Sequence, residues 1–382
     1  MNVLYVASDQ VVPGTTGGSV HVLEVARGLA RRGHQVDVVV QDGKGAARPE
    51  STGVRWHGVS WWPPHRFFRF RAQPAVAAVA EETRPDVIVE RYYNFGGEGI
   101  ATAKERGIPG VLEVNSPLVD HPGSLKGALD AALVVRPLKR RREAMVRDAA
   151  ALVAPIPEVV PAFARARTEI VTWGANVEAF SPGRREAAVR QALGIPEGAV
   201  AVLFSGSFRP WHGVHVLEDA VRRLRDRADI YFVLAGGDVA GQGDGYRGRR
   251  LGSVPYDTMP TVVAACDIGT APYDTARLAQ LRLGFFWSPL KVFEYMASGL
   301  PTVTIDRAPL GEVIREGEEG IHVREADPAA LADGLARLAG DEALRRRMGA
   351  SARRRVVERY SWDVHCAQLE GLLQRLVDRS AR

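Results

Sequence analysis

Two ionisable residues stand one helical turn apart in the stretch SPLKVFEYMASGLP, residues 288–301. Ser288 and Pro289 predict a helix start, with a hydroxyl N-cap and then a proline at the first helical position. Lys291 therefore falls in the first turn, where the positive end of the helix dipole disfavours a cation. Glu294 follows three residues later and lies on the same helix face. An anion bound at this helix N-terminus would explain the lysine.

A nucleoside diphosphate would use both side chains. Its diphosphate would lie over the helix N-terminus beside Lys291, and the carboxylate of Glu294 can accept hydrogen bonds from both hydroxyls of a ribose. The alternative is a Lys291–Glu294 pair on the helix surface, which would contribute only about 0.2–0.5 kcal/mol. We expect the ligand site and keep the surface pair as the alternative.

Two other strand–loop–helix junctions suit an anion. FSGSFRPWHG, residues 204–213, holds Arg209 and His212. Basic side chains beside helix-terminal amides can hold a diphosphate. In PGTTGGS, residues 13–19, the glycines let backbone amides approach a ligand. The alternatives are exposed loop residues in the first junction and a plain flexible turn in the second.

A nicotinamide-dependent enzyme is a weaker interpretation of the same pattern. Asp42 follows the second expected strand, where such enzymes hold the ribose. However, the glycines of residues 13–19 match neither the dinucleotide fingerprint nor a Walker loop. The glycine-dense run 235–254 predicts a loop. Arg249 in this loop would add positive charge near the diphosphate.

The bulk properties are those of a globular protein with two domains. The chain has 382 residues, 46% of them hydrophobic and 25% charged, with a formal net charge of +5. This charge mildly favours acidic or phosphorylated partners. Cys266 and Cys366 lack metal-ligand spacing and fit a reducing cytosol. No signal peptide or membrane span is evident, so we expect a cytoplasmic protein.

Short apolar strands alternate with helices along the whole chain, which predicts parallel sheets covered on both faces. A stretch near 174–196 that contains proline and glycine interrupts the alternation and predicts a linker. The expected strands are 2–7, 35–40, 86–90, 110–114 and 151–155 before it, and 199–206, 230–237, 267–272 and 300–305 after it.

Several segments resemble the retaining glycosyltransferases of family 4, which have the GT-B fold. The resemblance lies in SPLKVFEYMASGLPTV, in GGSVHVLEVARGLARRGHQVDVVV (17–40) and in FSGSFRPWHGVHVLEDA (204–220). GANVEAFSP (174–182) resembles the interdomain hinge, and ERYSWDVHCAQLEGLL (358–373) resembles a terminal helix that returns to the first domain. The resemblance covers essentially the whole chain, in the family's order.

The resemblance implies an α/β protein with two Rossmann-like, doubly wound parallel-sheet domains that face a central cleft. Residues 1–178, with a returning helix at about 362–382, would bind the acceptor. Residues 183–361 would bind the nucleotide sugar donor.

The family also implies roles for single residues. Gly17 and Gly18 would offer backbone contacts to the donor, and the amides around Leu290 would meet the diphosphate. Glu294 would hold the ribose, and Val254 falls where the main chain meets the nucleobase.

The sequence departs from the family at the donor site. Ser207 and His212 replace a frequent arginine and lysine, so Arg209, His212 and Lys291 would share the charge of the diphosphate. Phe286 replaces the first glutamate of a frequent pair, so recognition of the sugar must come from elsewhere.

A third departure concerns the reacting sugar. Asn115 replaces a histidine that follows the fourth strand in many members. Glu113, Asn115 and His121 are therefore the catalytic candidates.

The expected reaction moves a sugar from a UDP- or GDP-linked donor to an acceptor hydroxyl, with retention at the anomeric carbon. We expect no metal and no cofactor, because the sequence shows no paired aspartates of the kind that hold a cation beside a diphosphate. A nucleotide-sugar epimerase of the same fold and a non-catalytic partner subunit are the alternatives.

The acceptor stays open among a glycan, a lipid-linked sugar and a small natural product. Residues 61–71 are aromatic and basic, and residues 136–147 carry six basic side chains against Glu143. Both segments suit peripheral contact with an anionic membrane surface or with a phosphorylated acceptor. A partly buried aromatic loop and a solvated helix face are the alternatives. No nucleic-acid-binding module accompanies the charge.

Overall fold

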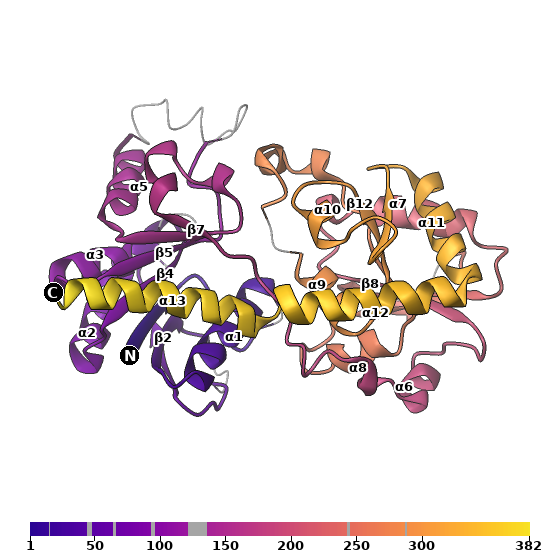
Figure 1. The fold of residues 1–382 in the computed structure, drawn as a ribbon, viewed down its shortest axis with the longest axis horizontal. Helices are drawn as coiled ribbons and strands as arrows, with labels where there is room; N and C mark the ends of the chain where they lie inside the picture. Colours follow the sequence, from indigo (N-terminus) through magenta and orange to yellow (C-terminus); the bar gives the residue numbers. More distant parts are fainter. Residues whose placement is uncertain are drawn as a thin grey trace. The chain divides into compact units, whose positions relative to one another are not determined.

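The computed structural model describes residues 1–382 except 15, 44–47, 64–65, 93–95, 121–135, 243–244 and 287–288. The chain forms two compact units. Unit 1 contains Met1–Thr172 and Trp362–Arg382, and unit 2 contains Trp173–Ser361. Each unit holds a parallel sheet with helices, as predicted (Figure 1).

The sheet of unit 1 has seven strands in the order β3-β2-β1-β4-β5-β6-β7. Its strands are β1 (Asn2–Ala7), β2 (Gln35–Gln41), β3 (Val54–Val59), β4 (Val87–Tyr92), β5 (Gly110–Val114), β6 (Ala151–Ala154) and β7 (Thr168–Ile170). Its α-helices are α1 (Gly17–Arg31), α2 (Gln73–Thr83), α3 (Glu98–Arg106), α5 (Arg136–Asp148) and α13 (Trp362–Ser380). Three short 3₁₀ helices are η1 (Arg66–Ala72), η2 (Pro157–Val159) and η3 (Ala162–Arg167).

The sheet of unit 2 has six strands in the order β10-β9-β8-β11-β12-β13. They are β8 (Val200–Ser205), β9 (Ile230–Gln242), β10 (Gly248–Gly252), β11 (Ile268–Ala271), β12 (Thr302–Ile305) and β13 (Gly320–Val323). The α-helices are α6 (Ala187–Ala192), α7 (Val214–Arg223), α8 (Met259–Ala264), α9 (Leu290–Ala297), α10 (Leu310–Val313), α11 (Pro328–Gly340) and α12 (Glu342–Arg359). The 3₁₀ helices are η4 (Pro182–Arg184), η5 (Pro210–His212), η6 (Thr275–Arg277) and η7 (Ala279–Leu283).

Apolar burial explains why these segments form sheets covered on both faces. Every residue of β4, β5 and β8 is buried, as expected of parallel strands covered on both faces. In unit 1, α13 lies beside α1 (Figure 1). A Cβ on Gly28 would stand 2.3 Å from the sulfur of Cys366, so glycine is what lets these two helices approach closely.

One predicted loop is in large part strand. Within residues 235–254, β9 continues to Gln242 and β10 follows at Gly248–Gly252. Gly248 serves close packing here, because a Cβ on it would lie 2.5 Å from the carbonyl oxygen of Phe232. Arg249 donates to the carbonyl oxygen of Ala192 at 2.5 Å, and its role as support for a diphosphate stays a prediction.

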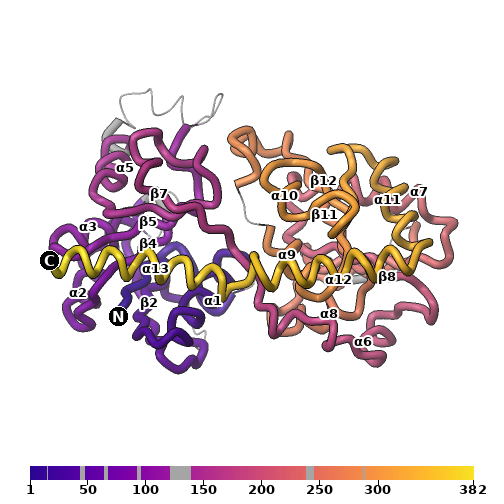
Figure 2. Tube along the Cα trace, viewed as in Figure 1, coloured from indigo at the N-terminus to yellow at the C-terminus, as the bar shows by residue number. Residues whose placement is uncertain are grey.

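The long helix α12 fixes the position of α9. The two helices lie side by side (Figures 1 and 2). Arg353 of α12 donates to the carbonyl oxygens of Ala297, at 2.7 Å, and of Phe180, at 2.8 Å. Ala297 is the last residue of α9, so the arginine satisfies an orphan carbonyl at that helix end.

Both sheets reverse their strand order beside their first strand, between β1 and β4 in unit 1 and between β8 and β11 in unit 2. In open parallel sheets, ligands bind outside the carboxyl strand ends at this switch point. The switch points are therefore where a site is expected in each unit.

Candidate functional site

Two predicted donor residues, Lys291 and His212, lie together at the switch point of unit 2. β8 ends at Ser205 and is followed by Gly206, and β11 ends at Ala271, two residues before Tyr273. The phenolic oxygen of Tyr295, on α9, accepts from the Ser205 N–H at 2.7 Å. This bond ties α9 to the end of β8.

Lys291 is buried, with 9% of its surface exposed. Its Nζ lies 4.3 Å from the ring centroid of Phe204 and 5.3 Å from that of Tyr273. Among the described residues it has no hydrogen-bond partner. Burial lowers the pKa of Lys291 to about 7, although the charge of Glu294 opposes the shift. A buried amine held between aromatic faces without a hydrogen bond is costly unless a ligand completes it.

His212 stands next to the same point. It is buried, and its Nδ1 has no hydrogen-bond partner within the part of the chain that the structure describes. Burial, with the charges of Lys291 and Arg209, lowers the pKa of His212 to about 2, so the ring is neutral. A Cβ on Gly206 would lie 2.7 Å from the Lys291 Nζ and 3.1 Å from the His212 Nδ1. The glycine thus leaves open the space toward which both nitrogens point.

The predicted start of α9 is wrong by one residue. The helix begins at Leu290, and Pro289 precedes it with a non-helical ψ of 71°. The proposed cap, Ser288, lies outside the described residues. Lys291 still falls in the first turn and Glu294 one turn later. Both are buried, so the alternative of a surface pair is excluded.

The other predicted donor residues are less enclosed. Arg209 is exposed, yet its charge lowers the pKa of His212, which places the two side chains near each other. Leu290 is half-buried at the first position of α9, and Val254 is half-buried in the segment after β10. Phe286 is buried, so it presents no polar group to a sugar.

The aromatic side chains of Phe204 and Tyr273 that surround the Lys291 amine were not predicted from the sequence. The Tyr273 ring stacks on the Trp211 ring at 5.8 Å and contacts the Phe285 ring at 4.7 Å between centroids. The sequence does contain a signal for these contacts. Phe204 lies near the carboxyl end of β8, Tyr273 follows the carboxyl end of β11, and the two strands are neighbours in the sheet.

In unit 1, α1 begins within the glycine-containing segment 13–19. Gly17 and Gly18 are its first residues, and the cap is Thr16, whose Oγ1 accepts from the Ser19 N–H at 3.2 Å. A Cβ on Gly18 would lie 2.4 Å from the Gln10 Oε1, so the end of the Gln10 side chain would have to move to admit it.

The two catalytic candidates that the structure describes in unit 1, Glu113 and Asn115, do not form one exposed group. Asn115 is half-buried, and its Nδ2 donates to the carbonyl oxygen of Glu113 at 3.2 Å. The Glu113 side chain is buried, accepts from the Tyr5 hydroxyl at 2.7 Å and pairs with His21 at 2.8 Å. Burial opposes the ionisation of Glu113, but the charges and hydrogen bonds around it lower its pKa to about 2. His121 lies outside the described residues.

The two basic segments of unit 1 meet. The guanidinium of Arg141, on α5, lies 4.2 Å from the ring centroid of Phe70 on η1. Trp62 is 77% exposed, and Lys139 and Arg140 are exposed. Among the described residues, no helix has the length and apolar character needed to cross a membrane.

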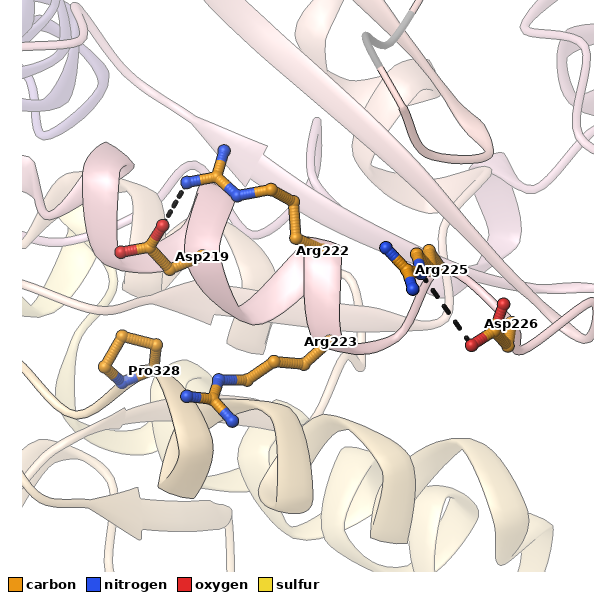
Figure 3. Close-up of a pocket in the computed structure, with 6 residues that line it drawn as sticks. All are labelled: Asp219, Arg222, Arg223, Arg225, Asp226 and Pro328. Atoms are coloured by element: carbon orange, nitrogen blue, oxygen red, sulfur yellow. Dashed lines mark hydrogen bonds and ion pairs between the residues drawn. The ribbon is translucent and has the colours of Figure 1, made fainter.

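A surface pocket of unit 2 lies elsewhere (Figure 3). It is lined by Asp219, Arg222, Arg223, Arg225, Asp226 and Pro328. Arg222 pairs with Asp219, and Arg225 lies 3.8 Å from Asp226, so much of the charge is balanced within it. None of the predicted donor residues lines this pocket.

Comparison with known protein families also divides the chain into two parts. The profile "Glycosyltransferase Family 4" matches residues 15–173, and the profile "Glycosyl transferases group 1" matches residues 199–341. The chain belongs to this family of glycosyltransferases, and it is an enzyme of the glycosyltransferase class with the GT-B fold.

Two relatives that match nearly the whole chain have the same name. A D-inositol 3-phosphate glycosyltransferase of Corynebacterium diphtheriae is 26% identical over 94% of this chain and 90% of its own. One of Xylanimonas cellulosilytica is 27% identical over 98% and 95%.

Solved structures share the fold at low identity. A sucrose-phosphate synthase from Thermosynechococcus elongatus has a TM-score of 0.76 and 17% identity, over 99% of both chains. HepE of Anabaena, in complex with UDP and glucose, has a TM-score of 0.68 and 15% identity over 98% of this chain and 100% of its own.

Proposed function

We propose that this glycosyltransferase takes its sugar from a nucleoside diphosphate sugar bound at the switch point of unit 2. The observation that carries the proposal is the buried Lys291 Nζ, which has no hydrogen-bond partner among the described residues and lies beside the His212 Nδ1. A diphosphate there would gain a charge-assisted hydrogen bond from Lys291 and the positive end of α9. Glu294, one turn on, would accept from the ribose hydroxyls.

The same groups supply the chemistry of the leaving diphosphate. Negative charge grows on the leaving oxygen as the glycosidic bond breaks, and donors held in place stabilise this charge without reorganisation. Arg209 is cationic, Lys291 becomes fully cationic when a bound diphosphate raises its pKa from about 7, and His212 offers a neutral ring nitrogen. Because these side chains and the α9 amides supply the positive charge, we propose a metal-independent reaction. Retention at the anomeric carbon is proposed from the family.

For the acceptor we propose a hydroxyl on a phosphate-bearing molecule, bound by unit 1. Two observations support this class. The relatives named above act, by their names, with D-inositol 3-phosphate. Unit 1 carries the exposed cations Lys139, Arg140 and Arg141 on α5, beside the aromatic η1. A free phosphorylated polyol and a phosphorylated lipid at a membrane surface share this chemistry.

The experiment begins with calorimetric titration of UDP, GDP, ADP, dTDP and NAD. We expect one ribonucleoside diphosphate to bind at micromolar strength and NAD not to bind. Sugars linked to that nucleotide are then offered with D-inositol 3-phosphate, or with vesicles that contain phosphatidylinositol, and the product is examined by NMR. Transfer with an unchanged anomeric configuration supports the proposal. Binding of NAD alone, or an inverted product, contradicts it.

A further inference from the structure

Three side chains that can ligate a metal converge inside unit 1. His21 comes from α1, Glu113 from β5 and His365 from α13. Their ligand atoms all lie within 4.8 Å of one another. The side chains are 0%, 5% and 1% exposed, respectively. This cluster belongs to unit 1, whereas Lys291 belongs to unit 2.

The hydrogen bond of His365 determines which of its ring nitrogens carries no hydrogen and presents a lone pair to the cluster. The His365 Nδ1 lies 2.8 Å from the carbonyl oxygen of Thr172. A carbonyl oxygen can only accept, so Nδ1 carries the hydrogen and the Nε2 of the neutral ring is an electron-pair donor. This Nε2 is 3.9 Å from the Glu113 Oε1 and has no hydrogen-bond partner among the residues described. Carboxylate and imidazole thus present electron pairs to the same space.

The same reasoning holds for His21. The Tyr5 hydroxyl donates its single hydrogen to the Glu113 Oε2 at 2.7 Å. The Tyr5 oxygen, 3.3 Å from the His21 Nδ1, can then only accept from this nitrogen, which it does when Nδ1 carries the hydrogen. The His21 Nε2 faces the Glu113 Oε1 at 2.8 Å. Either a hydrogen bond from an Nε2–H or a metal ion between the two atoms accounts for this short distance.

We propose that His21, Glu113 and His365 bind a divalent transition metal, with zinc as the best match. Two imidazoles and one carboxylate form a zinc ligand set, and each histidine has the Nδ1–H···O support that metal-bound histidines have. Ligand atoms of a tetrahedral zinc site stand roughly 3.4 Å apart. The two distances to Glu113, 2.8 Å and 3.9 Å, lie on either side of this value, and all three ligand atoms lie within 4.8 Å of one another. Shifts of about 0.5–1.5 Å would therefore bring the three atoms to the spacing of a zinc site. The ion would join α13 to α1 and β5.

The test uses the full chain after dialysis against a chelator. Co²⁺ alone is added and followed by visible absorption, and Zn²⁺ is added in a parallel melting experiment. We expect one Co²⁺ per chain with the intense bands of a tetrahedral site, displaced by Zn²⁺. At a hundredfold excess over the dissociation constant, Zn²⁺ should raise the melting temperature of unit 1 by about 5–10 °C. If neither ion changes absorption or melting, His21 and Glu113 are only a hydrogen-bonded pair and the proposal fails.

Variants locate the bound ion. His365→Gln should abolish the Co²⁺ bands. Tyr5→Phe removes only the hydroxyl that supports Glu113 and His21, and should weaken Co²⁺ binding by about 10–100-fold. His57→Gln is the matched control, because His57 pairs with Asp37 at 2.7 Å in the same unit and outside the cluster. Co²⁺ binding that survives in His365→Gln, or that is lost in His57→Gln, would overturn the proposal.

Discussion

Replacing Lys291 by methionine should lower kcat/KM for the nucleotide sugar by about 10²–10³-fold, the usual effect of removing one donor that stabilises a developing oxyanion. The reason is the position of the Nζ: it is buried between the rings of Phe204 and Tyr273, and no described residue accepts its hydrogens. Steady-state kinetics with the cognate donor measures the effect.

Stability should respond to Lys291→Met in the opposite direction. Methionine has a similar shape and no charge to desolvate, and burial already lowers the pKa of the lysine. The melting temperature of unit 2 should therefore hold or rise while activity falls. Lys104→Met is the matched control, since Lys104 is exposed and pairs with Asp148 in unit 1. A Lys291→Met enzyme within threefold of wild type would contradict the assigned role.

Replacing Glu294 by alanine should weaken binding of the ribonucleoside diphosphate by about 1.5–3 kcal/mol, the range for hydrogen bonds to a charged group. This corresponds to roughly 10–150-fold in the dissociation constant. Glu294 is 6% exposed, so its hydrogen bonds to a ribose would be shielded from water. Calorimetric titration of wild type and variant gives both constants.

Comparing the binding of the ribonucleotide and of its 2′-deoxy analogue distinguishes a lost ribose contact from a general loss of fold. Wild type should prefer the ribonucleotide, and Glu294→Ala should bind the two nucleotides with nearly equal affinity. Glu312→Ala, which removes an exposed carboxylate on α10 of the same unit, should keep the preference. A preference that persists in Glu294→Ala would assign the ribose to other residues.

The interior strands could be predicted from the sequence, whereas the edge strands could not. β1 and β5 have the predicted bounds 2–7 and 110–114, because buried parallel strands are continuous apolar runs. The four edge strands β3, β7, β10 and β13 were missed. β3, β7 and β10 include exposed residues, so their apolar pattern is broken, and β7 and β13 have only three and four residues. The long glycine-containing β9 was predicted only as far as residue 237.

The donor site could be predicted only where it is local in sequence. Lys291 and Glu294 stand on one helix, and their spacing alone pointed to a ligand. The burial of Lys291 depends on Phe204 and Tyr273, which the strand order of unit 2 brings to it. The start of α9 was misplaced because Pro289 fits both the last non-helical and the first helical position.

The buried cluster of unit 1 was not predicted. Glu113 was noticed as a catalytic candidate, but its contacts with His21 and His365 join residues far apart in the chain. The signal that was available is a carboxylate within the apolar run of β5. A buried charged group requires a partner, and only the fold shows which residues provide it.

The most direct test of the donor site is the number of protons taken up when the nucleoside diphosphate binds. Burial holds the pKa of Lys291 at about 7 in the free protein, and a bound diphosphate would raise it. Uptake should therefore be small at pH 6, where the amine is already charged, and approach one proton near pH 8. Calorimetry in buffers of different ionisation enthalpy gives this number, and Lys291→Met should abolish the pH-dependent part. Tight binding at pH 8 without proton uptake would show that Lys291 does not meet the diphosphate.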